Sequence, residues 1–596
     1  AKEHPVETVP NHPRPTEGRT ESILSSDDFT VIADRSKATG YDEWESQHQK
    51  KREHQSESQL EAELIETLKT QGYDYLPRLT DEAALIRNLR EQLERLNTRP
   101  EEGTYGPNSG FHFTDEEFNR LLTEHIARSN DGILEKAKLI QEERFIDFRL
   151  EDGTLRNIML IDAAYPARNH MQVINQYRVP APNGKVLNRY DVTILVNGLP
   201  LVHIELKKRN VSIREAFQQI ERYQNEGFQQ DKHRLFEYAQ IFVISNGFET
   251  KYYSNTVRHK HVEDQQTAGR KTASGGSAGK SFDFTSYWSD EQNNRINDLI
   301  LFARTFLTRH TLANVLTRYC IFTVGQDLLV MRPYQIAATE KIIKRVEIAN
   351  NNPKILGTKE AGGYIWHTTG SGKTLTSFKT ARRLAETGLV DKVIFVVDRK
   401  DLDYQTMLEY NNFQADSVSS TGSTRELSNR LADRGTNIVV TTIHKLSNLI
   451  TADSEHPVYG QRVAIIFDEC HRSQFGRMNT AIKKSFKKYS MFGFTGTPIF
   501  EKNSAGGPGT TTVEVFGDCL HTYTVVDAIN DKNVLKFHLE YTNTSPTFAE
   551  LEETSYAEEI AAERAETPDA KELEKFAKSK EVLESPERIE AVATYI

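Results

Sequence analysis

Cysteine is scarce in this chain, with three residues among 596. Cys320, Cys470 and Cys519 lack the paired spacing of a zinc site, and they are too few for a disulfide framework. This composition fits a reducing compartment, so we expect a cytoplasmic protein.

Long apolar stretches are absent as well. No run of residues approaches the length that a transmembrane helix needs, and the start of the sequence, rich in proline, glutamate and histidine, resembles no signal peptide. We therefore expect no membrane association.

The chain also lacks an excess of positive charge, because its formal net charge is −10. Binding to a polyanion would need local basic patches rather than the whole surface. Arg270, Lys271 and Lys280 form one candidate patch. They lie in a Gly/Ser-rich segment, however, for which a solvated loop is the simpler interpretation.

A phosphate-binding loop is the clearest motif in the sequence. Residues 368–374 read Thr-Thr-Gly-Ser-Gly-Lys-Thr, between the apolar run 364–366 and a helical pattern that ends before Gly388. Strand, loop and helix in this order place backbone N–H groups and a helix N-terminus around a phosphate. His367 stands where the strict pattern has a glycine.

This loop assigns residues to ATP and its Mg²⁺. Lys373 would reach the β and γ phosphates, and Thr374 would bind Mg²⁺. Further phosphate contacts would come from the loop backbone at Thr369, Gly370, Ser371 and Gly372.

An acidic pair follows the apolar run 465–467, which predicts a buried strand. Asp468 and Glu469 would then lie at the carboxyl end of that strand, where ligands of open α/β sheets bind. Asp468 would hold Mg²⁺ through water, and Glu469 would orient or deprotonate the attacking water.

A second polar constellation lies between residues 188 and 208. Two strand-like runs flank Asn197-Gly198, which is a strong hairpin signal. Glu205 and Lys207 share one face of the second run, and Asp191 on the first run supplies another carboxylate. Two carboxylates on Mg²⁺ can activate water beside a scissile phosphate, with the ammonium of Lys207 next to the nucleophile.

The register of the hairpin decides whether these groups meet. In an ideal two-residue hairpin, Asp191 would pair with Ile204 and point away from Glu205, because paired residues share a face. A metal site therefore requires one extra residue, in a three-residue loop or a β-bulge. We predict that irregularity, with Asp191 opposite Glu205.

A helix is expected directly after the hairpin. Ser212 to Glu215 reads as a capping box, and the apolar residues that follow have helical spacing. Gln219 and Tyr223 then lie one turn apart on one edge of the apolar stripe.

These motifs resemble two known kinds of domain. Asp191, Glu205 and Lys207 match the PD-(D/E)xK nuclease pattern, although Tyr190 replaces its proline. Superfamily 2 helicases and translocases commonly depart from the strict phosphate loop as His367 does. A Gln-x-x-x-Tyr nuclease joined to an Asp-Glu-Cys-His motor resembles the restriction subunit of Type I restriction-modification systems, from about residue 57 to the C-terminus.

The resemblance implies an α/β fold: a PD-(D/E)xK nuclease domain, then a RecA-like superfamily 2 lobe with a parallel sheet flanked by helices. It implies ATP-driven translocation and Mg²⁺-dependent cleavage of double-stranded DNA, together with methyltransferase (M) and specificity (S) subunits. It also implies that Gln219 and Tyr223 belong to the nuclease site. Gln335 would bond the adenine edge, with Arg332 or Tyr334 flanking the ring.

Related nucleases often carry an accessory glutamate on their first helix, which we expect to open near Ser58. Glu57, Glu61 and Glu63 are alternatives for that role. Glu61 could instead be the acid of a capping box, and the sequence leaves the choice open.

The expected segments are a polar, partly disordered tail (1–55), the nuclease domain (56–260), a flexible Gly/Ser-rich loop (261–281), a mainly helical connector with the first motor lobe (282–545), and a linker with the start of a truncated second lobe (546–596).

Two rival interpretations exist. A DNA remodeller or helicase could use an inactive nuclease-like domain as a DNA clamp, but it would not need Asp191, Glu205 and Lys207 together. A scaffold with a structural nucleotide would not need Glu469.

Overall fold

The computed structural model describes residues 55–106, 109–180, 186–209, 211–223, 232–256, 285–397, 410, 419–420, 423–468, 475–501, 511–531, 533–534 and 589. The chain divides into two units, residues 1–534 and 535–596, and every helix and strand named below belongs to the first. The predicted tail before residue 55, the Gly/Ser-rich loop, residue 469 and, apart from residue 589, the predicted linker lie outside the described residues.

The N-terminal part is built on a six-stranded mixed sheet with the order β1-β4-β5-β6-β7-β8. β1 pairs with β4 and β6 with β7 in parallel, whereas the other neighbours are antiparallel. The strands are β1 (Asp74–Tyr75), β4 (Met171–Pro180), β5 (Val186–Val196), β6 (Leu199–Leu206), β7 (Ile241–Ser245) and β8 (Thr250–Ser254).

Helices and a small hairpin surround this sheet. They are α2 (Glu57–Thr70), α3 (Glu82–Asn97), α4 (Asp115–Leu121), α5 (Ile133–Lys138), the π-helical turn η4 (Leu139–Glu143), the hairpin β2 (Phe145–Arg149) and β3 (Leu155–Met159), and α6 (Ile213–Arg222). The start predicted for α2 was two residues late, because Ser56 caps this helix and forms a reciprocal box with Gln59. Glu61 is therefore not the capping acid.

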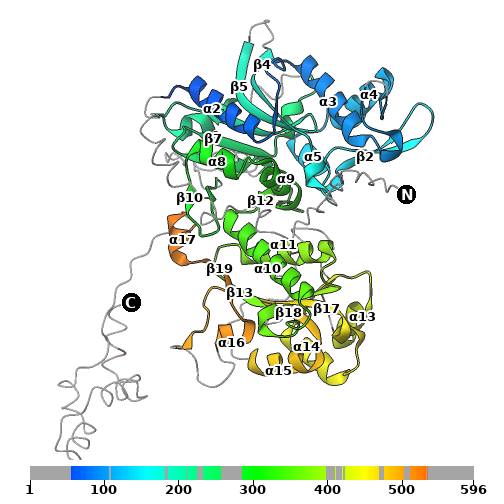
Figure 1. Cartoon of the computed structure of the whole chain (residues 1–596), viewed down its shortest axis with the longest axis vertical. Helices are drawn as coiled ribbons and strands as arrows, with labels where there is room; N and C mark the ends of the chain where they lie inside the picture. Colours follow the sequence, from blue (N-terminus) through cyan, green and yellow to red (C-terminus); the bar gives the residue numbers. More distant parts are fainter. Residues whose placement is uncertain are drawn as a thin grey trace, which may run out of the picture. The chain divides into compact units, whose positions relative to one another are not determined.

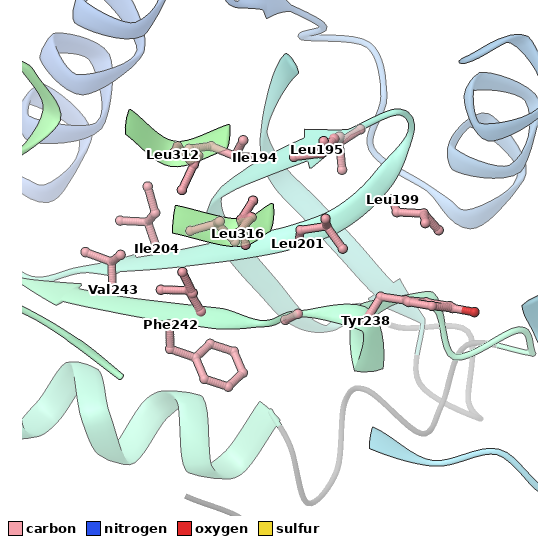
Figure 2. Close-up of a cluster of buried hydrophobic side chains, with 14 of the residues drawn as sticks. Ile194, Leu195, Leu199, Leu201, Ile204, Tyr238, Phe242, Val243, Leu312 and Leu316 are labelled. Atoms are coloured by element: carbon pink, nitrogen blue, oxygen red, sulfur yellow. The ribbon is translucent and has the colours of Figure 1, made fainter. Parts of the chain in front are cut away.

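The connector packs onto the nuclease sheet. It contains β9 (Trp288–Ser289), β10 (Arg295–Ile296), α8 (Leu299–Thr305), α9 (Arg309–Arg318), β11 (Cys320–Phe322) and β12 (Leu328–Val330). Its helices were expected, but the short strands, which pair with one another, were not. Leu312 and Leu316 of α9 share one buried cluster with Ile194 and Ile204 of the sheet (Figure 2).

The motor part is a seven-stranded sheet with the order β15-β16-β14-β17-β18-β13-β19. All of its neighbouring strands are parallel, as predicted for a RecA-like lobe. The strands are β13 (Gly363–His367), β14 (Lys392–Val397), β15 (Ser419–Ser420), β16 (Ile438–Thr442), β17 (Arg462–Asp468), β18 (Lys488–Thr495) and β19 (Cys519–Tyr523).

Helices cover both faces of this sheet (Figure 1). Alternate residues of β14 enter different cores: Val393 and Phe395 pack with α10 and α11, whereas Ile394 and Val396 pack with the helices of the other face. None of the described helices is long and apolar enough to cross a membrane. The helices are α10 (Pro333–Asn351), α11 (Lys373–Thr387), α13 (Thr424–Ala432), α14 (Ile443–Ala452), α15 (Phe475–Ser485), α16 (Thr512–Phe516) and α17 (Val525–Asn530).

Candidate nuclease and nucleotide sites

The hairpin between β5 and β6 has the predicted irregularity. Asn197 and Gly198 both have positive φ, +52° and +83°, as a two-residue type I′ turn requires. Leu195 pairs with Pro200, but Ile194 pairs with Val202, so Leu201 is an extra residue in a β-bulge. Val192 therefore pairs with Ile204, and Asp191 comes to the position opposite Glu205.

The polar groups of the predicted triad lie together on this face. Asp191 Oδ2 accepts a hydrogen bond from the backbone N–H of Leu206 at 2.9 Å. Lys207 Nζ donates to Glu205 Oε1 at 3.2 Å and to the Leu206 carbonyl at 2.9 Å. The bulge thus brings Asp191 to Glu205 and Lys207, from which an unbroken ladder would separate it.

Burial changes the titration of both carboxyl groups. Burial, reinforced by the neighbouring Glu205, raises the pKa of Asp191 above its usual range. Burial also raises the pKa of Glu205, although Lys207 opposes that shift. Positive charge in addition to that of Lys207 would favour full ionisation of the pair.

A divalent cation fits this need. Glu205 Oε2 is buried and has no hydrogen-bond donor among the described residues, so it is a suitable oxygen ligand. No group of three or more His, Cys, Asp or Glu side chains in the described part of the chain is placed to share a metal. A cation here would use the two carboxylates together with backbone oxygens or water.

His203 is a neighbour of the site that the sequence patterns did not single out. It is buried on the same strand face as Glu205, with Nε2 at 3.6 Å from Glu205 Oε2. Its Nδ1 lies 3.1 Å from Thr193 Oγ1, and burial lowers the pKa of His203 to about 4. The available signal was its position two residues before Glu205, which places both on one face.

Gln219 and Tyr223 lie on α6 and at its C-terminal cap, next to the strand that carries Asp191. Gln219 Nε2 donates to the Tyr223 hydroxyl, which donates to the Arg189 carbonyl at 2.7 Å. The Tyr223 ring also packs 4.7 Å from that of Tyr190. These contacts fix β5 just before Asp191.

The three alternative glutamates have different partners. Glu57 Oε1 accepts from the Lys208 N–H at 3.4 Å, and its charge contributes to the raised pKa of Glu205. Glu61 instead binds the side-chain amides of Asn175 and Gln176. Glu63 accepts from Gln55 at 2.8 Å. Glu57 is therefore the glutamate whose charge acts on the Asp191–Glu205 pair.

The phosphate loop joins β13 to α11, and Gly388 ends the helix with φ +67°, as predicted. Gly370 and Gly372 have φ of +79° and +77°, a region that favours glycine. A Cβ at Gly372 would lie 2.7 Å from Gln335 Nε2, whereas one at Gly370 would meet nothing within 4 Å. The loop can thus present its backbone to a ligand at Gly370.

Two side chains at the start of α10 hold this loop. The Tyr334 hydroxyl donates to the Ser371 carbonyl at 2.8 Å, and Gln335 Nε2 donates to the same carbonyl at 3.1 Å. Gln335 Oε1 also accepts from the Arg332 N–H at 2.9 Å. The adenine contact of Gln335 stays a prediction, but its amide already has a structural role.

A cavity of about 320 Å³ adjoins the loop. Arg332, Gln335 and the loop residues 370–372 line one part of it, and residues 252–254 of β8 line another. Two residues predicted to contact adenine and three predicted to contact phosphates, Gly370, Ser371 and Gly372, therefore border one cavity.

The carboxyl ends of neighbouring parallel strands lie beside the phosphate loop. Asp468 ends β17 and pairs with Phe494 of β18, which itself pairs with β13. Trp366 Nε1 donates to the Gly496 carbonyl at 3.1 Å, so the segment after β18 contacts the strand before the loop. The described residues include Asp468 but not the neighbouring position 469.

His367, the residue that departs from the strict motif, is fully buried and lies 3.0 Å from His521, between Nε2 and Nδ1 respectively. His521 Nε2 in turn lies 3.1 Å from the Glu291 carbonyl. Burial lowers the pKa of both imidazoles. Other phosphate loops have a glycine at this position. Here His367 links the loop to the connector through His521.

Two family models match the chain. The Type I restriction enzyme R protein N terminus matches residues 54–261, and the SWI2/SNF2 ATPase matches residues 334–573. The endonuclease subunit of the Type I restriction enzyme EcoprrI from Escherichia coli is 43% identical over 314 residues, which are 53% of this chain and 90% of that protein. The chain belongs to the family of Type I restriction enzyme endonuclease subunits.

Longer members of the family agree with this assignment. The SsaAORF53P endonuclease subunit from Staphylococcus saprophyticus is 39% identical over 91% of this chain and 52% of its own length. The SauCOLORF180P endonuclease subunit from Staphylococcus aureus is 40% identical over 86% of this chain and 50% of its own length. The chain therefore spans about half the length of these relatives.

One solved structure that is similar to the chain is a nuclease-deletion mutant of the Type ISP restriction-modification enzyme LlaGI in complex with a DNA substrate mimic. The match covers 42% of this chain and 24% of that one, with 18% sequence identity and a TM-score of 0.27. This similarity is too low to support a conclusion. The two family models, in contrast, divide the candidate sites between them: one contains Asp191, Glu205 and Lys207, and the other contains Gln335, Lys373 and Asp468.

Proposed function

We propose that this chain provides the nuclease and ATP-binding part of a Type I restriction subunit, which translocates double-stranded DNA with ATP and cleaves it with Mg²⁺. The observation that carries the proposal is the bulge at Leu201, which aligns Asp191 with Glu205. A domain that only clamped DNA would gain nothing from two buried carboxylates with raised pKa values and a lysine at 3.2 Å. The same chain carries a phosphate loop in a parallel sheet.

In the nuclease site, Asp191 and Glu205 would hold Mg²⁺, which supplies an activated water and charge compensation for the scissile phosphate. Lys207 lies beside Glu205 and would position the nucleophile or the phosphate. The hydrogen bond from Leu206 N–H holds Asp191 Oδ2 and orients this carboxylate. We assign the accessory acid to Glu57, because its charge acts on Glu205.

Gln219 and Tyr223 would act through the backbone. Their hydrogen bonds run from α6 to the Arg189 carbonyl, two residues before Asp191. We therefore assign them to positioning β5, with their polar groups next to the path of a DNA strand. His203 would support Glu205 from the neighbouring position on the same strand face.

In the motor site, the loop backbone from Thr369 to Gly372 would bind the phosphates of ATP, and Lys373 would neutralise the β and γ phosphates. Thr374 and Asp468 would hold the Mg²⁺ that neutralises charge on the transferred phosphoryl group. We assign water activation to Glu469. Arg332 borders the cavity beside Gly370 and would contact the base.

The partners follow from the family. The relatives are named endonuclease subunits of Type I restriction enzymes, and we propose that this chain likewise works in the cytoplasm with M and S subunits on duplex DNA. The alternative, an ATP-driven remodeller with an inactive nuclease-like clamp, predicts that the triad can be removed without loss of activity.

Cleavage of circular DNA by the full-length assembly tests the proposal. Asp191→Ala, Glu205→Ala and Lys207→Ala should each abolish cleavage while ATP hydrolysis and translocation continue, because the motor residues are untouched. Asp147→Ala removes an exposed carboxylate of the same domain and is the matched control that should cleave normally. Undiminished cleavage by the three triad variants would replace the nuclease assignment with the clamp.

A further inference from the structure

A group of basic side chains, outside both sites above, gathers where the second half of α11 meets the end of α9 and the end of η4. We call it the basic cluster. Its members are Arg144, Arg318, Lys379, Arg382 and Arg383. They come from segments that lie far apart in the sequence.

The carboxylates acting on the cluster are fewer than its cations. Glu386 accepts from Arg382 Nε at 2.8 Å and from Arg383 Nη1 at 2.7 Å. Glu340, whose Oε1 accepts from the Tyr319 hydroxyl at 3.2 Å, also acts on Arg318. Among the described residues, five basic groups of the cluster therefore face two acidic ones, a surplus of positive charge in a poorly hydrated place.

Backbone carbonyls offset part of this surplus. Arg144 donates to the Thr317 carbonyl at 3.3 Å, in the last turn of α9, and Lys379 lies 3.5 Å from the carbonyl of Cys320, the first residue of β11. A carbonyl at a helix C-terminus favours a cation, but such a contact is worth only about 0.3–1 kcal/mol at the surface. These contacts do not explain why so many guanidinium groups are buried together.

Arg383 has hydrogen-bond donors that no described residue satisfies. Only 4% of the residue is exposed, and its Nε and Nη2 are buried with no hydrogen-bond partner among the described residues. Nε and Nη2 form one edge of the planar guanidinium, the pair of parallel donors that matches two oxygens of a phosphate or carboxylate. The opposite nitrogen, Nη1, is the one that binds Glu386.

Arg318 has a similar deficit. It is 5% exposed, its Nη2 donates to the Ala164 carbonyl at 3.4 Å, and its buried Nε has no partner among the described residues. Burial and the neighbouring Arg383 lower the pKa of Arg318 to about 9. Burial together with Arg382 and other neighbours likewise lowers the pKa of Lys379 to about 7.

The cluster is open to solvent at one side. The side chain of Arg382 is 31% exposed and that of Glu386 is 41% exposed, whereas Lys379, Arg318 and Arg383 lie deeper. The outer residues therefore form the side from which an oxyanion would enter the cluster.

We propose that the basic cluster binds a phosphate oxyanion through the free edge of Arg383 and the Nε of Arg318. The oxyanion is either free inorganic phosphate or one backbone phosphate of DNA. Because α11 begins at the phosphate loop, the bound oxyanion would tie the motor helix to the connector helix α9. This inference does not depend on the nuclease and motor roles proposed above.

The first measurement is thermal unfolding of the purified chain in sodium phosphate and in sodium chloride of equal ionic strength. We expect Tm to rise with phosphate beyond the rise with chloride, since a ligand of the folded state stabilises it. The rise should persist in a Lys373→Ala background, which separates the cluster from the phosphate loop. It should disappear in Arg383→Gln and in Arg318→Gln.

Two further variants make the result decisive. Arg383→Lys keeps the charge but removes the paired donors, so it should lose most of the phosphate effect even if Arg383→Gln does not fold. Arg430→Gln breaks an exposed Arg–Glu pair on α13 at the same i, i+4 spacing as Arg382 and Glu386, and it should keep the full effect. Equal Tm curves in phosphate and chloride for the Lys373→Ala chain, or a full effect in Arg383→Lys, would overturn a free-phosphate site.

The second measurement separates the two sources of the oxyanion. Fluorescence anisotropy with a short DNA duplex at several salt concentrations gives the affinity and its salt dependence. If the oxyanion belongs to DNA, Arg383→Lys should weaken binding and reduce the slope of log K against log salt by about 0.9 for the lost contact. If it is free phosphate, DNA binding should be unchanged. No response in either measurement would refute the site.

Discussion

Gln335 offers a sharp test of how the phosphate loop is held. Its Nε2 donates to the Ser371 carbonyl at 3.1 Å while its Oε1 caps α10. A side chain that stabilises the loop should affect every nucleoside triphosphate alike. One that reads adenine should affect ATP more than GTP.

The magnitude follows from the hydrogen bonds. A neutral hydrogen bond contributes about 0.5–1.5 kcal/mol, and a buried acceptor left without its donor costs about 1–3 kcal/mol. Tyr334→Phe removes one of the two donors to Ser371 and should weaken nucleotide binding about two- to tenfold. Gln335→Glu keeps the cap and removes the other donor, while Tyr334 still donates to Ser371, so we again expect about two- to tenfold weaker binding.

Titration with ribose-labelled ATP and GTP measures both affinities, because the label leaves the base free. We expect Kd for the two nucleotides to rise by the same factor in each variant. Gln71→Ala is the matched control, since Gln71 also donates to a backbone carbonyl, at 3.1 Å, but far from the loop in sequence. The reasoning fails if Gln335→Glu leaves GTP binding unchanged and selectively weakens ATP binding.

Three further predictions concern the two candidate sites and the hairpin that carries Asp191 and Glu205. Lys373→Ala should abolish ATP-driven translocation by the full-length assembly but spare DNA binding, because the charge on the β and γ phosphates is lost; undiminished triplex displacement would contradict this. Burial raises the pKa of Glu205, so the folded state gains stability from the protonated carboxyl at low pH and loses it as the pH rises through the raised value. In Mg²⁺-free buffer, Glu205→Gln should therefore raise Tm most at alkaline pH, and Mg²⁺ should raise Tm of the wild type but not of this variant. Gly198→Ala places a Cβ 2.7 Å from Leu89 Cα at φ +83°. It should lower the free energy of unfolding by more than the about 1–2 kcal/mol of backbone strain expected for the control Gly153→Ala, where φ is +85° and nothing lies within 4 Å. Equal losses of Tm in the two variants would contradict the clash.

Local patterns predicted most of the elements that carry the sites. Asn197-Gly198 identified the turn because both positions need positive φ, and Gly388 identified the end of α11. The turn residues alone did not predict the register of the hairpin. A regular ladder would turn Asp191 away from Glu205, so the bulge was predictable only from the requirement that both carboxylates share a metal ion. The start of α2 was missed because Ser56 and Ser58 are both plausible caps, and only the observed bonds choose between them.

Contacts between distant segments could not be read from the sequence. The hydrogen bond from Gln335 to Ser371 joins residues 36 positions apart, and no local pattern distinguishes it from an adenine contact. The basic cluster is more remote still, because Arg144 and Arg383 come from different parts of the chain. His203 had a usable signal in its spacing from Glu205, but a buried histidine on a strand is more often structural.

The bulge at Leu201 also sets what changes of length the hairpin can tolerate. From Asp191 to the turn, β5 has one residue fewer than β6 has from the turn to Glu205, and the bulge absorbs the difference. Loss of Leu201 would make the two arms equal and leave the carboxylates opposite each other in a regular ladder. Loss of one residue from β5 would turn one carboxylate toward the apolar face, unless a second bulge compensated. The proposed nuclease site thus tolerates arms of equal length without a bulge and arms that differ by one residue only with one, so insertions should survive only where a new bulge restores this pairing.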